Sequence, residues 1–473
     1  MSSSSDQGKS STLSQTNQSD YVVPPEQYGP PQSASQKLTP LDMNMPRVYG
    51  ARWIMCFHLP PGTDKAQVYK DLRTGLAHTI ISIPWIAGNI GPEEGSNSAD
   101  NRVQIVDSSD GVKFPFKDLT GVLPSYEDLE KDGFPLSKLS TEDLGPIGVL
   151  PTTASPPVLA AQANFLENGL LLTVGVHHAA CDASSLEDIV STWAHNTEAA
   201  GGSLSFMAHD PLSSDRSPLM ERTPGANIAD FPEYKIDTQP QAGPPPGFQF
   251  PAMSSRVFHF SPESLAGLKA SAAAFSTHDA LCAFLWRQMT LARRIPGVSP
   301  DPPSSEERSA LAFAVNIRGR ASPPLPPTYM GNASMLTITD RLPASAIILG
   351  DGLPRAAAAV RNSLGVFGSP ARVPLTIGLL ASRPDPTDFR LAYHAFLGPD
   401  VVATSWADLK VYEKSWGALG TVGAFRVPGE GADGMIMILP RLRDGGLEVV
   451  VGLELGAMER LLEADEFAKA TGR

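Results

Sequence analysis

The sequence predicts an α/β (α+β) protein with two domains. Short apolar runs alternate with segments of helical periodicity in both halves of the chain. The length of 473 residues exceeds what one typical hydrophobic core organises. Between about 211 and 252, prolines interrupt every possible helix and few apolar runs remain. Such a stretch is typical of a crossover between two domains.

We therefore divide the chain into four parts. Residues 1–37 are rich in Ser, Gln and Pro, have almost no apolar periodicity, and are predicted to form a disordered tail. The tail lacks the apolar stretch of a signal peptide and the arginines of a transit peptide. We expect an N-terminal domain over 38–210, a Pro-rich crossover over 211–252, and a C-terminal domain over 253–473.

In the N-terminal domain, the run 53–57 is short, apolar and stopped by Pro60-Pro61-Gly62, so it predicts a strand. The segment 64–82 has helical spacing, and 171–176 predicts a second buried strand. From Leu186 to Trp193, apolar residues recur at i, i+3, i+4 and i+7, which predicts a helix capped by Asp182, Ser184 or Ser185.

The C-terminal domain resumes the alternation. Strands are predicted at 257–260, 311–317, 335–338, 435–439 and 447–451. Helices are predicted at 265–274 and 277–294, and a closing helix at 457–468.

Composition excludes several classes of function. The net charge of -13 argues against nucleic acid or an anionic membrane surface as a partner. No apolar run approaches the roughly 20 residues that cross a bilayer. The 3 cysteines, widely spaced and odd in number, form neither a disulfide framework nor a zinc cluster, so we expect a reducing, cytoplasmic setting. Neither a G-x-S-x-G elbow nor a P-loop occurs, which leaves serine hydrolase and nucleotide triphosphate chemistry without support.

The most informative motif is His177-His178-Ala179-Ala180-Cys181-Asp182, at the end of the apolar run 171–176. A histidine placed where a buried strand ends can act as a general base near neutral pH. Two other interpretations stay open on these residues alone. Both histidines can be ordinary core residues, or His178 and Asp182 can bind a metal, although a third ligand is not identifiable.

The hexapeptide resembles the HHxxxD box of the BAHD-type, CoA-dependent acyltransferases, whose fungal branch includes trichothecene 3-O-acetyltransferase-like proteins. Further boxes of this family follow in order. They are Asp215-Arg216-Ser217, Ser276-Thr277-His278-Asp279-Ala280-Leu281 with Trp286-Arg287, Asn316-Ile317-Arg318-Gly319-Arg320, Tyr329-Met330-Gly331-Asn332, and Thr404-Ser405-Trp406 with Tyr412. The resemblance covers roughly residues 38 to 470.

The resemblance implies a two-domain, chloramphenicol-acetyltransferase-like fold with a channel between the domains. It implies His178 and Asp182 as the candidate catalytic residues, with His178 as the general base in a ternary complex. Asp182 would support the turn by pairing with Arg318, and we expect His177 to be a structural neighbour. Asn332 would contact CoA or the reacting centre, and Thr404 and Trp406 would hold the acceptor or the oxyanion.

Two positions depart from the family pattern. Ala183 stands where the family usually has glycine, and the DFGWG box reads Glu413-Lys414-Ser415-Trp416-Gly417. Because that box is mainly structural, its change concerns packing on the CoA side more than the chemistry.

The predicted function is an O-acyltransferase that moves an acyl group, acetyl being the commonest in the fungal branch, from acyl-CoA to a hydroxyl of a small secondary metabolite. No bound cofactor, metal, nucleic acid or membrane partner is expected, and we expect a monomer. One alternative takes the acyl group from a carrier protein. Another is a catalytically inactive relative that binds a small molecule.

Overall fold

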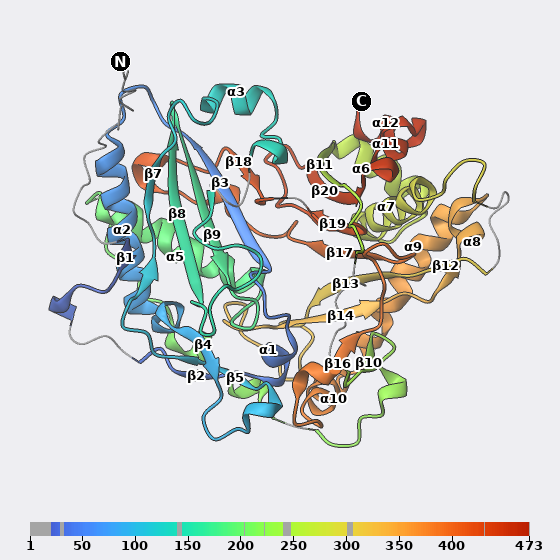
Figure 1. The fold of residues 1–473 in the computed structure, drawn as a ribbon, viewed down its shortest axis with the longest axis horizontal. Coiled ribbons are helices and arrows are strands. Elements are labelled where there is room, and N and C mark those ends of the chain that lie inside the picture. The colour runs from blue at the N-terminus through green and yellow to red at the C-terminus, as the bar shows by residue number, and fades with distance from the viewer. Residues whose placement is uncertain are drawn as a thin grey trace, which may run out of the picture.

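A computed structural model describes residues 20–28, 33–139, 144–202, 204–221, 223–239, 247–299, 306–429 and 431–472. Two large sheets lie side by side, and helices pack on each (Figure 1). The predicted mixed α/β class is confirmed. No helix in these residues is long and apolar enough to cross a membrane.

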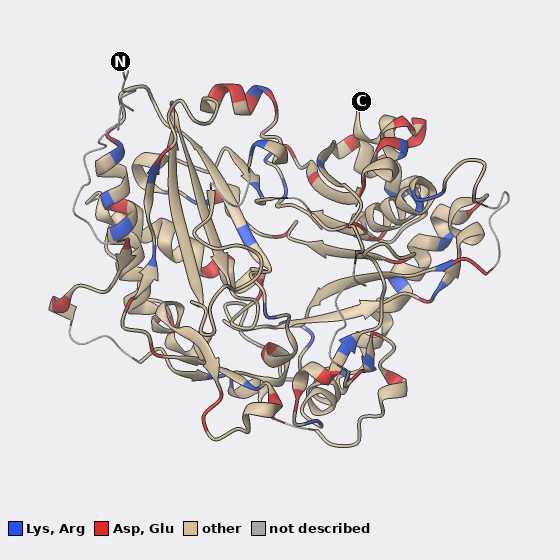
Figure 2. Cartoon of the chain, viewed as in Figure 1, with Lys and Arg blue, Asp and Glu red and all other residues tan. Residues whose placement is uncertain are grey.

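The first sheet has the order β1-β6-β8-β9-β3-β18, and β7 also pairs with β8. Its strands are β1 (Tyr21–Val22), β6 (Val112–Lys113), β7 (Phe116–Asp118), β8 (Leu159–Leu166), β9 (Gly169–Val176), β3 (Ala51–His58) and β18 (Ala424–Arg426). Every residue of β8 and β9 is buried, and neither strand carries a charge (Figure 2). Helices cover one face, and a small cluster around Tyr126 and Phe134 covers the other. Burial on both faces explains why β9 reads as a continuous apolar run.

The helices of this half follow from local signals. They are α1 (Pro40–Asn44), α2 (Lys65–Ser82), α3 (Tyr126–Lys131) and α5 (Ala183–Ala200). Asp64 and Asp182 accept backbone hydrogen bonds at the starts of α2 and α5. A smaller sheet joins β2 (Gln36–Lys37), β5 (Val103–Val106) and β4 (Asn89–Pro92).

The second sheet has the order β11-β20-β19-β17-β13-β14, and β17 runs parallel to both of its neighbours. Its strands are β11 (Met253–Phe260), β20 (Leu447–Glu454), β19 (Met435–Ile438), β17 (Val401–Ser405), β13 (Leu311–Asn316) and β14 (Ser334–Ile338). Two short pairs join β10 (Tyr234–Ile236) to β16 (Phe389–Leu391) and β12 (Arg308–Ser309) to β15 (Leu342–Pro343).

Helices α6 (Pro262–Ser271), α7 (Thr277–Ala292), α8 (Ala344–Ile348), α9 (Gly352–Ser363) and α10 (Arg372–Leu380) build the second core with this sheet. The predicted closing helix is wrong as one element, because two helices occur there, α11 (Leu455–Glu463) and α12 (Asp465–Thr471). Ala464 is extended between them, with φ -75° and ψ 115°. The acidic Asp465 and Glu466 then stand in the first turn of α12, where the helix dipole favours them.

The prediction that all of 1–37 is a disordered tail is wrong for part of it. β1 pairs with β6 and β2 pairs with β5, although residues 1–19 and 29–32 lie outside the described residues. Val22 is buried in the first core. Each of these two short strands forms its backbone hydrogen bonds with the edge of a sheet that already exists. Such pairing does not require an apolar periodicity in the strand itself.

The boundary at 253 does not separate the two cores. β18 pairs with β3, and the chain from 406 to 427 packs into the first core. Its buried members there are Trp406, Leu409, Val411, Tyr412, Trp416, Leu419, Val422, Phe425 and Val427. The described part of 211–252 contains no α-helix, in line with its prolines, but it is more than a linker, because β10 pairs with β16 and Arg216 is buried.

Candidate active site

His178 is the second residue after β9, in the turn that leads into α5. Its backbone N–H donates to the Val48 carbonyl at 2.8 Å. The imidazole lies against Gly50, where a Cβ atom would stand 2.6 Å from His178 Cδ2. Only glycine leaves room for the ring at this position, so the start of β3 helps to define where the imidazole lies.

Asp182 and Arg318 form the predicted pair, which is confirmed. Arg318 Nη1 donates to Asp182 Oδ2 and Nη2 to Oδ1, each at 2.9 Å, and both side chains are buried. Asp182 also accepts from Ser185 N at 3.0 Å and from Ala333 N at 2.9 Å. With these donors the carboxylate caps α5 and joins it to the segment between β13 and β14. The pair therefore attaches the turn that contains His178 to the second half of the molecule.

The charges of the site follow from this packing. Burial favours the neutral acid of Asp182, but the Arg318 guanidinium and the backbone donors outweigh it and hold the pKa of Asp182 below its ordinary value. Burial lowers the pKa of His178, and the nearby Asp182 and Asn332 oppose that effect only in part. The site thus combines a neutral imidazole with a buried ion pair near it.

His177 is a structural neighbour in the turn, as predicted. It is buried, and its Nδ1 accepts the Ala179 N–H at 3.3 Å. The ring of Tyr49 meets it edge-on, with centroids 5.5 Å apart. Burial, with the charge of Arg47, lowers the pKa of His177 from 6.5 to about 3. This imidazole is therefore neutral and serves as a hydrogen-bond acceptor within the turn.

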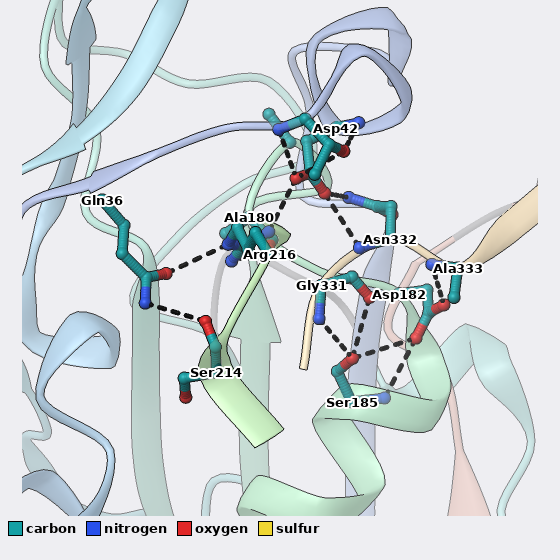
Figure 3. Close-up of polar contacts among 12 residues, drawn as sticks. Gln36, Asp42, Ala180, Asp182, Ser185, Ser214, Arg216, Gly331, Asn332 and Ala333 are labelled. Carbon is teal, nitrogen blue, oxygen red and sulfur yellow. Dashed lines mark hydrogen bonds and ion pairs between the residues drawn. The ribbon is translucent and has the colours of Figure 1, made fainter. Parts of the chain in front are cut away.

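Asn332 contacts the turn that contains His178, and none of its surface is exposed. Its Nδ2 donates to the His178 carbonyl and to Asp42 Oδ1, both at 2.8 Å, and its backbone N–H donates to the same Asp42 oxygen at 2.8 Å. Figure 3 shows the two contacts of Asn332 with Asp42 beside those of Asp182 with Ser185 and Ala333.

Sequence analysis did not assign Asp42 or Arg216 to this site, although Arg216 stands in the box Asp215-Arg216-Ser217. Arg216 donates to Asp42 Oδ2 at 2.7 Å and to the Ala180 carbonyl at 2.8 Å (Figure 3). Asp42 belongs to a capping box with Thr39 at the start of α1, and that spacing was the available signal. It predicts a helix start but gives no sign that the carboxylate also reaches Asn332.

Thr404 and Trp406 lie at the end of β17. Thr404 is half-buried and stands opposite Met437 of β19. Trp406 is buried in the first core, with its ring 6.0 Å from that of Trp53 and 6.1 Å from that of Phe425. The chain therefore crosses from the second sheet into the first core at this point.

An open cavity of about 280 Å³ lies between α7, β13 and β17. Its wall includes Asn316 and Ser405 at the ends of two strands, and Arg320 and Arg441 from the adjoining loops. Asn316 Oδ1 accepts from the Arg318 backbone N–H at 3.0 Å, so this wall is continuous with the Asp182–Arg318 pair.

The two departures from the box pattern are accommodated. Ala183 is the first residue of α5. Trp416 is buried between Phe57 and Trp193, at 5.6 Å from each ring. Gly417 has φ +64°, and a Cβ there would lie 2.9 Å from Glu198 Cα. Trp416-Gly417 thus keeps a packing function against α5, in the first core. In the described residues, no three His, Cys, Asp or Glu side chains cluster closely enough to hold a metal ion.

Comparisons with known proteins agree with this architecture. The model of the Transferase family matches residues 14–468. An acyltransferase of Emericella nidulans, easC, is 29% identical over 456 residues, covering 91% of this chain and 93% of that protein. The eremophilane O-acetyltransferase ORF8 of Penicillium roqueforti is 28% identical, with 92% and 98% covered.

Solved structures share the fold. F. graminearum TRI101, complexed with coenzyme A and deoxynivalenol, has a TM-score of 0.79 at 21% identity, covering 92% of this chain and 98% of that one. Vinorine synthase has a TM-score of 0.65 at 19% identity, with 95% and 97% covered. These likenesses confirm the two-domain fold expected from the boxes. The chain belongs to the Transferase family, the BAHD-type acyltransferases.

Proposed function

We propose that this acyltransferase moves an acyl group, with acetyl as the first candidate, from acyl-CoA to a hydroxyl of a small secondary metabolite. The observation that carries the proposal is His178, an imidazole whose pKa is lowered by burial and whose turn is held by the buried pair of Asp182 and Arg318. Through Asn316 this pair adjoins the cavity near α7, which is lined by two arginines and by Asp408. The relatives support the reaction class, because they are named acyltransferases and O-acetyltransferases.

In the proposed reaction, His178 accepts the proton of the acceptor hydroxyl as its oxygen attacks the thioester carbonyl. A C–O bond forms, and the carbonyl electrons move onto the oxyanion. When the intermediate collapses, the C–S bond breaks and the leaving thiolate of CoA takes the proton from the imidazolium. A lowered pKa keeps His178 able to accept a proton near neutral pH, and general-base assistance is worth roughly 10²- to 10⁴-fold. No acyl-enzyme is required.

Other residues have positioning functions in this proposal. Asp182 and Arg318 hold the turn, and Asn332 supports it from below. Thr404 and Trp406 are proposed to hold the acceptor or the oxyanion, where a fixed donor is most effective. If the two docked halves exclude water from the site, these electrostatic contacts become stronger.

The cavity near α7 is the proposed entry of the donor. Guanidinium groups suit the phosphates of CoA, and Arg320 and Arg441 stand on its wall. We predict that Arg320→Ala and Arg441→Ala each raise the KM for acetyl-CoA, by about tenfold, without changing the KM for the acceptor. Steady-state kinetics with acetyl-CoA and with S-acetylpantetheine, which lacks those phosphates, measure the effect.

The exposed Arg355 on α9 provides the matched control, since it pairs with Asp351 at 2.9 Å and does not line the cavity. Equal KM increases for acetyl-CoA and S-acetylpantetheine would contradict the assignment of the phosphates to this wall.

The acceptor can be found with a panel of hydroxylated terpenoids, polyketides and alkaloids, scored by release of free CoA thiol and by the acyl mass gained. Deleting the gene in its host and comparing metabolites identifies the natural product that loses an acyl group. Transfer only from an acylated carrier protein would favour the carrier-dependent alternative. Tight binding of an acceptor without transfer from any donor would favour a non-catalytic binding protein.

A further inference from the structure

A buried carboxylate beneath the catalytic turn has more donors than a helix cap requires. Asp42 is fully buried, and its Oδ2 accepts from Thr39 N at 2.9 Å, from Thr39 Oγ1 at 2.8 Å and from Arg216 at 2.7 Å. Its other oxygen, Oδ1, accepts from the backbone N–H and from the side-chain Nδ2 of Asn332, each at 2.8 Å. Such a charge is tolerated in the interior only with this number of partners.

These contacts fix the orientation of the Asn332 amide. The Nδ2 group has two hydrogens, and both are used, one by Asp42 Oδ1 and one by the His178 carbonyl. If the amide were flipped, its Oδ1 would face a carboxylate oxygen and a carbonyl oxygen. Asp42 therefore permits one orientation, and in that orientation Oδ1 is buried with no hydrogen-bond partner.

Asp42 also acts on the turn through Arg216. Arg216, kept in place by Asp42, donates to the Ala180 carbonyl at 2.8 Å. Asn332 and Arg216 thus bind the carbonyls of His178 and Ala180. Asp182 and Arg318 hold the end of the same turn where α5 begins.

We propose that Asp42 is a positioning residue for the general base: by fixing the Asn332 amide, it fixes the backbone and the ring of His178 in the orientation that proton transfer requires. This inference rests on the proposed function of His178. It is supported by the effect of the amide on the base, since burial lowers the pKa of His178 and Asn332 is among the groups that raise it again.

The ionisable groups around His178 come from every part of its surroundings. They are His177 and Cys181 in the same turn, the pair of Asp182 and Arg318, the pair of Asp42 and Arg216, and Arg47 next to His177. Four of these groups form two buried ion pairs, Asp42 with Arg216 and Asp182 with Arg318.

The test is Asp42→Asn, which keeps the shape of the side chain but can offer only one acceptor oxygen. We expect kcat to fall between about 10- and 100-fold, as for a small misplacement of a reacting group, with little change in the KM values. We also expect the acidic limb of the pH profile of kcat/KM to move to lower pH, because a support that raises the pKa of His178 is weakened. Asn332→Ala should shift the limb in the same direction, and it replaces Asp42→Asn if that variant does not fold.

Asp279→Asn is the matched control. Asp279 is also a fully buried carboxylate in a capping box with an arginine partner, Arg361, but it caps α7 in the second half. Its loss should lower the unfolding free energy without moving the acidic limb. If the profile of Asp42→Asn superimposes on that of the wild type, with activity reduced only by its folded fraction, Asp42 is a structural residue and the proposal is wrong.

A measurement without turnover separates this proposal from the proposed function. In protein labelled with [¹⁵N]histidine, the imidazole signal of His178, assigned by its loss in His178→Ala, reports its pKa and tautomer directly. A shifted titration in Asp42→Asn supports the positioning role even if no acceptor is known. An unshifted titration contradicts it, whatever the enzyme acylates.

Discussion

Two adjacent histidines have different surroundings because the turn buries them to different extents. His178 lies half-buried against Gly50, whereas His177 is enclosed by the turn and by Tyr49. The assignment of His178 as the base and of His177 as its neighbour stays a prediction, whereas the pair of Asp182 and Arg318, implied by the resemblance, is present. Asp42 could not be predicted, since the contact with Asn332 joins positions 290 residues apart and no local spacing encodes it.

The low pKa of His177 has a consequence for stability. Its folded pKa of about 3 lies below the ordinary 6.5, so the unfolded chain binds the proton more readily between these values. Stability is therefore lost as the pH falls below about 6.5. We predict that His177→Asn, which keeps an acceptor for the Ala179 N–H, removes about 2 kcal/mol of this loss between about pH 7 and pH 5.

Urea unfolding of the wild type and His177→Asn at several pH values measures the difference. Subtracting the two curves cancels the other titrating groups, including Asp182. Parallel curves would mean that His177 takes up its proton as readily in the folded protein as in the unfolded chain, which contradicts the lowered pKa.

At the level of elements, long strands and helices were predicted well and short edge strands were not. β3, β9, α2 and α5 carry strong periodicity or continuous apolar runs. β1 and β2 contain two residues each and are held by the sheets that they join. The pairing of β18 with β3 could not be predicted either. A strand of three residues is too short for its own sequence to indicate which sheet it joins.

The structure predicts that deletion of residues 1–37 lowers the melting temperature and does not merely shorten the chain. Deletion removes the pairing of β1 with β6 and of β2 with β5, the buried Val22, and the Gln36 side chain that accepts from Arg216 at 3.0 Å. Differential scanning calorimetry of the two chain lengths provides the measurement. Val22→Asp in the full chain should reproduce part of the loss, and identical melting temperatures for the full and shortened chains would restore the disordered-tail prediction.

At the level of the whole molecule, the site exists only where the two halves meet. The first half supplies His178 and Asp182, and the segment between β13 and β14 of the second half supplies Arg318 and Asn332. The chain from 406 to 427 then returns to the first core and joins the halves again. The sequence could assign the residues by resemblance, but their meeting depends on how two separate sheets dock.

The proposed chemistry depends on one proton acceptor in this junction. The most direct measurement is release of free CoA thiol from acetyl-CoA in the presence of an acceptor, with the wild type and His178→Ala compared at equal folded concentration. We predict that His178→Ala lowers the rate by roughly 10²- to 10⁴-fold while its circular dichroism and melting temperature stay close to those of the wild type. Undiminished turnover by a folded His178→Ala protein would contradict the assignment of His178 as the general base.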